Sequence, residues 1–128
     1  LVDDDNLILD VLSKILGREG FKTLKALSGT QALETIAANN VWMVISDIEM
    51  PGMNGMDLLV RVKEYDDHIP VLMITGKGAM YNRHQVIDAG ADGYITKPFR
   101  NIEVIDCVSL VYRKVFAISA PARSTVGR

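Results

Sequence analysis

Short apolar runs alternate with amphipathic stretches along most of the chain. Two runs, 41–45 and 71–74, are apolar throughout, which is typical of strands covered on both faces of a parallel sheet. Leu1-Val2 has the character of a strand end, 21–27 alternates like a half-buried strand, and 93–96 predicts a further short strand. The stretches between these runs repeat apolar residues every three or four positions, which predicts helices. Five helices are expected. The first begins near Asp5 or Asn6 and the second at Ser28-Gly29, and the other three cover about 56–65, 79–89 and 101–116.

Five strand–helix units in succession predict an α/β fold. We expect a five-stranded parallel sheet, doubly wound, with helices on both faces and right-handed crossovers. One domain is predicted over 1–116, and 117–128 lose the periodicity and are expected to form a tail or linker. Only Leu1 and Val2 precede the acidic run, whereas a strand usually has about five residues. We therefore expect the first strand to be truncated at its N-terminal side.

Composition narrows the function classes. The chain has 128 residues, 48% of them hydrophobic and 23% charged, as in an ordinary globular domain. A net charge of −2 offers no electrostatic footprint for nucleic acid, so we expect no direct nucleic-acid binding by this domain. No apolar run approaches the roughly 18 residues of a membrane span, and we expect a cytoplasmic domain without membrane contact. The one cysteine, Cys107, excludes an internal disulfide and is expected to pack as a small hydrophobe.

Polar side chains follow the apolar runs where the expected strands end. They are Asp3 and Asp4 after the first run, Asp47 after the third, Thr75 after the fourth and Lys97 after the fifth. Functional groups of an open parallel sheet collect beyond the carboxyl ends of its strands, so we expect these side chains to meet. Clustered carboxylates repel one another unless a cation joins them, and their oxygens suit Mg²⁺, which often shares its coordination with phosphate. Asp47 can then act as a nucleophile that forms an aspartyl phosphate.

Four segments at these strand ends carry a combined motif. Their sequences are LVDDD (1–5), ISDIEMPGMNG (45–55), MITG (73–76) and GADGYITKPF (90–99). In combination they resemble the receiver domain of the response-regulator family, which acts in two-component signalling. The resemblance covers about residues 1–116, and it implies a flavodoxin-like receiver fold of five βα units.

The resemblance implies a role for each residue of the acidic cluster. Asp47 would be the phosphoacceptor, and Lys97 would contact the phosphoryl group. A Mg²⁺ cofactor would be held by Asp4, by Asp47 and by the backbone carbonyl of Glu49. Asp3 would act on the same ion through bound water.

Further implied roles concern switching and phosphate lifetime. Thr75 would be the switch hydroxyl, and Tyr94 the switch aromatic that turns inward when Thr75 moves. The Lys97-Pro98 peptide is expected to be cis. Glu49 and Lys77 lie two residues after Asp47 and Thr75, and we hypothesise that they tune the rate of dephosphorylation.

The resemblance also implies partners. A phosphohistidine on a sensor histidine kinase or a phosphotransfer protein would donate to Asp47, and the domain itself would be no enzyme beyond self-catalysed phosphotransfer and slow autodephosphorylation. The switched surface would be helix four, strand five and helix five, which would bind an output domain or form a homodimer.

Gly93 and the sequence of 101–108 depart from one large DNA-binding subfamily, which argues against that subfamily's dimer mode. His68 and His84 lack the context of a phosphodonor and are expected at the surface.

Two alternatives stay open. Asp3-Asp4-Asp5-Asn6-Leu7 is similar to the Asp-x-Asp-x-Thr/Val motif of haloacid-dehalogenase-type phosphatases, although Leu7 departs from it and 47–51 would be left unexplained. The second alternative is a pseudo-receiver, an interaction module that takes no phosphoryl group.

Overall fold

The computed structural model describes residues 1–76 and 80–119, and it places the chain in a three-layer α/β arrangement. The helices are α1 (Asn6–Arg18), α2 (Gly29–Ala38), α3 (Gly55–Tyr65), α4 (Arg83–Asp88) and α5 (Asn101–Ser119). The strands are β1 (Val44–Asp47), β2 (Val71–Thr75) and β3 (Gly93–Thr96), which correspond to the third, fourth and fifth strands expected from the sequence.

The sheet is parallel and is ordered β1-β2-β3. Two further segments extend it past β1, because Val2 bridges in parallel to Ser46 on one side and to Ala26 on the other. Hydrogen bonds from Val2 N to Ile45 O (2.8 Å) and from Asp47 N to Val2 O (2.9 Å) bind the first residues to β1. The acidic run at residues 3–5 therefore emerges beside the end of β1.

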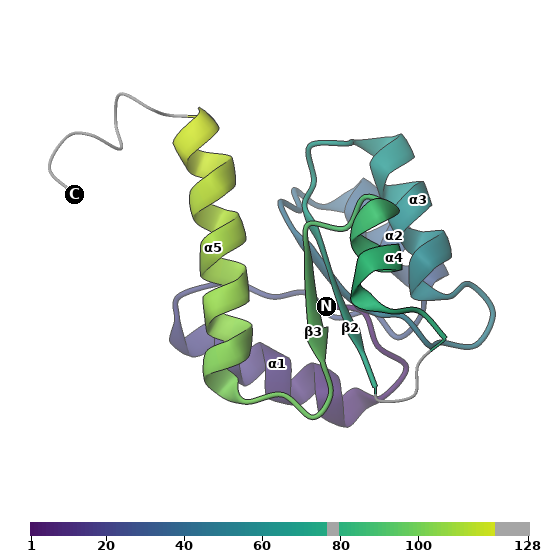
Figure 1. The fold of residues 1–128 in the computed structure, drawn as a ribbon, viewed down its shortest axis with the longest axis horizontal. Helices are drawn as coiled ribbons and strands as arrows, with labels where there is room; N and C mark the ends of the chain where they lie inside the picture. The colour runs from purple at the N-terminus through teal and green to yellow at the C-terminus, as the bar shows by residue number, and fades with distance from the viewer. Residues whose placement is uncertain (77–79, 120–128) are drawn as a thin grey trace, which may run out of the picture.

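Two apolar layers cover the sheet on opposite faces. On one face, Leu12 and Ile15 of α1 and Val104 and Val108 of α5 pack against Ile45, Leu72, Ile74 and Ile95. On the other face, α2, α3 and α4 bury Ile36, Leu58, Leu59 and Val86 against Val44, Val71 and Met73. Figure 1 shows α5 on one side of the strands and α3 and α4 on the other. The doubly wound α/β class expected from the alternation of patterns is confirmed.

The strand predictions need two corrections. Residues 21–27 form no continuous strand along their whole length: Ala26 bridges to Val2, and hydrogen bonds with Leu1 and Asp3 involve only Leu24 and Ala26 of this segment. The expected strand at 41–45 begins later, at Val44, and runs to Asp47. Its partner β2 starts at Val71, directly after Pro70, whose nitrogen carries no hydrogen to extend the ladder.

The helices follow their capping residues. Asp5 Oδ1 accepts a hydrogen bond from Leu7 N, and Ser28 Oγ accepts one from Gln31 N, so α1 and α2 begin where the polar residues predict. The described part of the expected helix at 79–89 begins only at Arg83, since Asn82 forms its N-cap. The last helix extends through Ser119, three residues beyond the predicted end at 116. In the part of the chain that the structure describes, none of the helices has the length and apolar character of a membrane span.

Candidate functional site

Three carboxylates meet at the carboxyl edge of the sheet. Ligand oxygens of Asp3, Asp4 and Asp47 lie within 4.8 Å of one another. Asp3 and Asp47 are only 2% and 6% exposed, whereas Asp4 lies at the surface. Asp3 is held in place by its own turn, because its Oδ1 accepts a hydrogen bond from Asp5 N at 2.9 Å.

Lys97 brings the balancing charge from the end of β3. Its Nζ donates a hydrogen bond to Asp3 Oδ2 at 3.1 Å and lies 3.4 Å from Asp47 Oδ2. Its backbone is positioned by a hydrogen bond from Lys97 N to Thr75 O at 2.7 Å, and the Lys97-Pro98 peptide is cis, as expected. One ammonium group thus bridges two buried carboxylates that come from different strand ends.

The pKa values at the site reflect burial and the presence of one ammonium group, that of Lys97, beside three carboxylates. Burial raises the pKa of Asp47; Lys97 opposes this, Asp3 adds to it, and the net pKa lies above the ordinary value. Burial lowers the pKa of Lys97, but its contacts with Asp3 and Asp47 outweigh burial and raise the pKa overall. Lys97 therefore stays charged at neutral pH, and the pocket still holds three carboxylates against one ammonium.

The backbone after Asp47 turns sharply because residue 55 has no side chain. A Cβ on Gly55 would overlap the carbonyl oxygen of Asp47 and lie 2.7 Å from Cα of Ile48. Gly55 N donates to Ile48 O at 2.7 Å, and Ile48 N donates to Ile74 O at 3.1 Å. The start of α3 thus packs directly on the loop that carries Asp47 and fixes its direction.

Thr75 ends β2 beside this cluster. It is completely buried, and its Oγ1 has no hydrogen-bond partner among the described residues. A buried hydroxyl without a partner carries a free-energy cost, which a ligand that accepts a hydrogen bond from Thr75 Oγ1 at this site would remove. Thr75 lies one residue beyond Ile74, which is the register partner of Asp47.

The remaining predicted site residues fall outside the charged cluster. Glu49 is exposed, and its N–H donates to Asp47 Oδ1 at 3.4 Å. Tyr94 is half-buried on β3, in register with Met73. Lys77 lies outside the described residues.

The chain matches the family model described as response regulator receiver domain over residues 1–109. The chain belongs to the response-regulator receiver domain family. It is 37% identical over 114 residues to the heme response regulator HssR of Staphylococcus epidermidis, covering 89% of this chain and 50% of that protein. It is 34% identical over 114 residues to the transcriptional regulatory protein SrrA of Staphylococcus aureus, covering 89% and 47%. The receiver domain thus spans about half the length of these curated relatives.

Solved structures agree on the fold. A CheY-like response regulator receiver domain from Methanospirillum hungatei has a TM-score of 0.82 at 29% identity, covering 89% of this chain and 91% of the other. The receiver domain of NtrX from Brucella abortus has a TM-score of 0.81 at 32% identity, covering 86% and 93%. These likenesses confirm the flavodoxin-like receiver fold, and the family favours neither the phosphatase nor the pseudo-receiver alternative.

The donor set at the sheet edge fits a magnesium ion. Its atoms are hard carboxylate oxygens, gathered within 4.8 Å and short of positive charge. Asp4 is exposed and faces no ammonium group in an ion pair of the described residues, so its carboxylate is open to an ion arriving from solvent.

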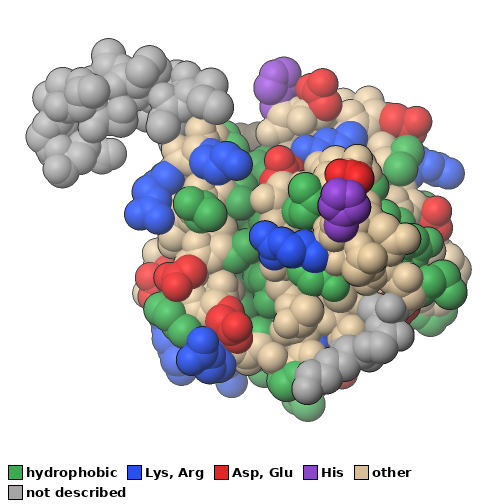
Figure 2. All heavy atoms as spheres, viewed as in Figure 1, with side chains coloured by type: hydrophobic (Ala, Val, Ile, Leu, Met, Phe, Trp, Pro, Cys, Tyr) green, Lys and Arg blue, Asp and Glu red, His purple; other side chains and the backbone are tan. Residues whose placement is uncertain are grey.

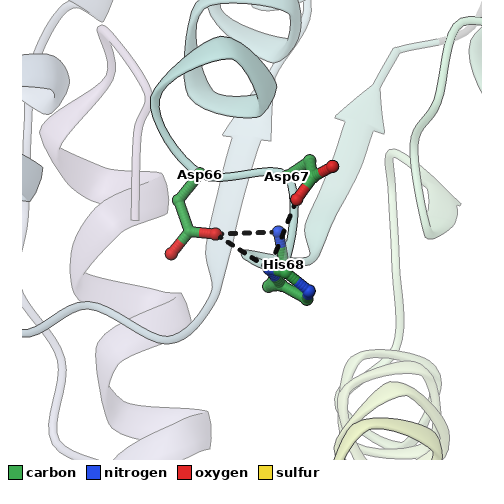
Figure 3. A group of neighbouring side chains, drawn as sticks. All are labelled: Asp66, Asp67 and His68. Carbon is green, nitrogen blue, oxygen red and sulfur yellow. Dashed lines mark hydrogen bonds and ion pairs between the residues drawn. The ribbon is translucent and has the colours of Figure 1, made fainter.

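A second group of possible ligands lies at the opposite edge of the sheet, in the loop before β2. Figure 3 shows Asp66 and Asp67 beside the His68 ring, whose Nδ1 lies 3.3 Å from Asp66 Oδ1 and 3.3 Å from Asp67 Oδ1. Both histidines of the chain are surface residues, as expected, and Figure 2 shows histidine side chains in purple on the molecular surface. His68 N also donates to Asp66 Oδ1 at 2.9 Å, so the group forms an exposed turn.

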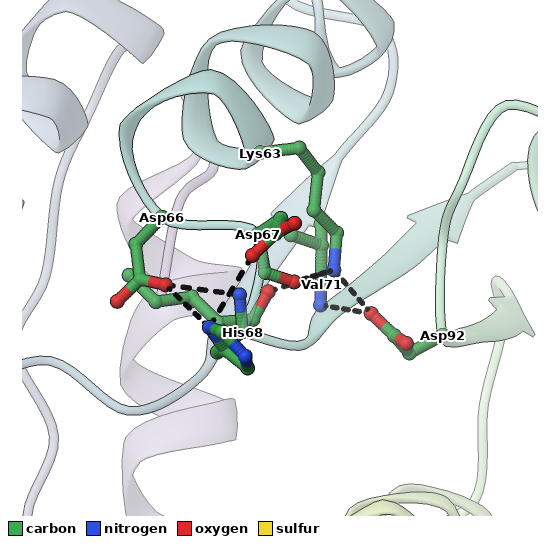
Figure 4. Close-up of polar contacts among 7 residues, drawn as sticks. Lys63, Asp66, Asp67, His68, Val71 and Asp92 are labelled. Atoms are coloured by element: carbon green, nitrogen blue, oxygen red, sulfur yellow. Dashed lines mark hydrogen bonds and ion pairs between the residues drawn. The ribbon is translucent and has the colours of Figure 1, made fainter.

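Sequence reasoning missed the polar link beside that turn. Lys63 Nζ donates to Asp92 Oδ2 at 3.0 Å and to Ile69 O at 2.9 Å, and Asp92 Oδ2 also accepts from Val71 N at 2.9 Å (Figure 4). The link ties α3 to the starts of β2 and β3. A lysine on a helix and an aspartate before a glycine carry no local signal for such a contact.

Proposed function

We propose that this receiver domain accepts a phosphoryl group on Asp47 and thereby relays a two-component signal. The observation that carries the proposal is the placement of a buried carboxylate, Asp47, against the ammonium of Lys97 at the carboxyl edge of the sheet. Receiver domains are signalling phosphoacceptors, and the homologous regulators share this part of their length.

The transfer step has a simple balance. A carboxylate oxygen of Asp47 attacks the phosphorus of a phosphohistidine whose other ring nitrogen carries a proton, the phosphorus–nitrogen bond breaks, and the electron pair of that bond stays on the neutral imidazole that leaves. Lys97, already 3.4 Å from Asp47, offsets the negative charge that spreads over the phosphoryl oxygens. The buried hydroxyl of Thr75, which has no partner among the described residues, donates to one of those oxygens in the product.

Asp4, Asp47 and the Glu49 backbone carbonyl would hold Mg²⁺, with Asp3 acting through water. When bound, the ion neutralises carboxylate repulsion and the charge of the phosphoryl group. The close grouping of the three carboxylate oxygens supports this assignment.

The readout of phosphorylation is a change at Thr75 and Tyr94. The movement of the Thr75 hydroxyl toward the phosphoryl group alters the face of β2 and β3 on which Tyr94 lies, and the α4–β3–α5 surface changes with it. An output domain or a second copy of the receiver binds that surface. Glu49, exposed two residues after Asp47, and Lys77 set how fast water removes the phosphoryl group.

The donor is a phosphohistidine of a sensor histidine kinase or a phosphotransfer protein. The domain needs no enzyme activity of its own beyond self-catalysed transfer and slow loss of the phosphoryl group.

Incubation with Mg²⁺ and acetyl phosphate, followed by intact-mass measurement, tests the proposal. We expect one phosphoryl adduct in the wild type and none in Asp47→Asn. Asp57→Asn, on the first turn of α3, is a matched control that should keep the adduct. An adduct that survives in Asp47→Asn, or catalytic release of phosphate from small phosphomonoesters, would overturn the assignment.

A further inference from the structure

Arg83, the first residue of α4, lies over the ring of Tyr94 on β3. Its guanidinium carbon is 6.0 Å from the ring centroid, at the limit of the range in which a cation is attracted by the face of an aromatic ring. The ion pairs among the described residues do not include Arg83. No carboxylate of the described residues therefore holds its guanidinium away from the Tyr94 ring.

The turn that presents Arg83 is well anchored. Asn82 Oδ1 accepts from Gln85 N at 2.9 Å, while Gln85 Oε1 accepts from Asn82 N at 2.9 Å, which is a capping box. One turn on, Val86 is completely buried in the core cluster on which Tyr94 also packs. The backbone of Arg83 is thus fixed by the capping box before it and by the buried Val86 after it.

Tyr94 shares a sheet face with Thr75. Tyr94 is in register with Met73, and Thr96 is in register with Thr75. Because alternate residues of a strand point to the same side, these four side chains lie on one face. A movement of the buried Thr75 hydroxyl therefore changes the packing on the sheet face that carries the Tyr94 ring.

Cys107 of α5 lies near the same stretch of β3. Burial raises the pKa of its thiol, whereas the N–H of Tyr94 and the guanidinium of Arg83 lower it. Gly93 makes room for this approach, since a Cβ there would lie 2.9 Å from Cys107 Sγ. Arg83 thus stands where α4, β3 and α5 come together.

We propose that Arg83 is a positioning residue that holds the Tyr94 ring in the unphosphorylated domain and so sets how readily the α4–β3–α5 surface changes state. The inference rests on the proposed function and deepens it by naming a control on the switch. Loss of the contact should shift the equilibrium away from the present arrangement about two- to fivefold, the range of a partly exposed cation–ring contact.

The first test needs no phosphoryl transfer. Ring resonances of Tyr94 are recorded by NMR in the unphosphorylated wild type, Arg83→Gln and Arg83→Lys. We expect Arg83→Gln to move these resonances and Arg83→Lys, which keeps the cation, to move them less. Thermal unfolding followed by circular dichroism checks that all variants fold, and Arg61→Gln on the exposed side of α3 controls for the loss of one positive charge.

The second test is a double-mutant cycle on the rate of phosphorylation by acetyl phosphate. Arg83→Gln should raise the rate about two- to fivefold in the wild-type background, and it should have no further effect in Tyr94→Leu, which lacks the ring. Arg61→Gln should leave the rate unchanged.

Three results would overturn the inference: unchanged Tyr94 resonances in Arg83→Gln, an equal effect of Arg83→Gln with and without the Tyr94 ring, or the same effect from Arg61→Gln. The proposed function fails separately, through a wild type that takes no phosphoryl group. In that case the ring resonances still decide whether Arg83 positions Tyr94.

Discussion

The ammonium nitrogen of Lys97 lies 3.4 Å from a carboxylate oxygen of Asp47, although the two residues belong to different strand ends in different halves of the chain. The sheet makes this contact possible, because parallel strands deliver their carboxyl ends to one edge. The contact places a positive charge beside the proposed phosphoacceptor before any phosphoryl group arrives. Four predictions follow from the balance of charge and space around it.

Replacing Lys97 should lower both the stability of the domain and its rate of phosphorylation. Lys97→Met leaves Asp3 and Asp47 buried without their shared cation, so we expect a loss of about 1–3 kcal/mol in the free energy of unfolding at pH 7 without divalent ions. We also expect at least a tenfold slower reaction with acetyl phosphate. Urea unfolding and intact-mass time courses measure the two. Lys25→Met, which removes an exposed ion pair with Asp10, should change neither appreciably; a Lys97→Met variant as stable and as reactive as the wild type would contradict the charge balance described.

Magnesium should stabilise the domain through the carboxylates. An ion that binds only the folded state at about a hundredfold excess over its Kd adds about 2.7 kcal/mol to the free energy of unfolding. We expect Asp4→Asn to lose most of this gain while changing little in the presence of a chelator, since Asp4 is exposed. Asp66→Asn, in the exposed Asp66-Asp67-His68 turn, is the control and should keep the full gain. Thermal unfolding with and without Mg²⁺ measures it, and an equal loss in both variants would place the ion elsewhere.

The raised pKa of Asp47 sets a pH dependence. Burial lifts the pKa of the folded carboxyl above its unfolded value, so between these two pKa values the folded state binds more protons than the unfolded state, and stability falls as the pH rises. The stability contributed by protonated Asp47 is present at low pH and is lost once the pH exceeds the folded pKa. Asp47→Asn should therefore stabilise the metal-free domain by about 0.5–2 kcal/mol at pH 7, and the gain should vanish near pH 3.

Urea unfolding in a chelator at several pH values measures this difference. Asp67→Asn, at an exposed position, is the matched control and should show no such profile. A stability gain of Asp47→Asn that grows toward low pH would reverse the sign and refute the electrostatic explanation.

Two glycines should respond in opposite ways to alanine. Gly55→Ala places a Cβ against the Asp47 carbonyl, so we expect a loss of more than about 2 kcal/mol and slower phosphorylation. Gly17→Ala lies in α1 with no atom within 4 Å of the new Cβ, and helix propensity predicts a gain of about 0.5–1 kcal/mol. Chemical denaturation compares them. Equal effects would mean that close packing of α3 does not position the loop after Asp47.

Much of the fold could be predicted from local pattern. The apolar runs at 41–45 and 71–74 predict the centre of a parallel sheet, and β1 and β2 are buried along their whole length. Capping residues such as Ser28 located helix starts, because a side-chain oxygen on a backbone N–H is a local interaction. The segment at 21–27 joins the sheet only near Leu24 and Ala26, since alternation reports the face that a strand would bury and not how far along its length it pairs.

The candidate site also combines features that the sequence predicts with features that only the tertiary structure decides. By itself the sequence determined that Asp3, Asp4, Asp47, Thr75 and Lys97 stand at successive strand ends, because an apolar run that stops at a polar residue is readable from local order alone. Only the tertiary structure decided that Asp3 and Asp47 share one ammonium, that the Thr75 hydroxyl is buried without a partner among the described residues, and that Arg83 faces the Tyr94 ring. Burial and charge pairing depend on which distant segments pack together, and that packing is set by the whole core rather than by any one stretch of chain.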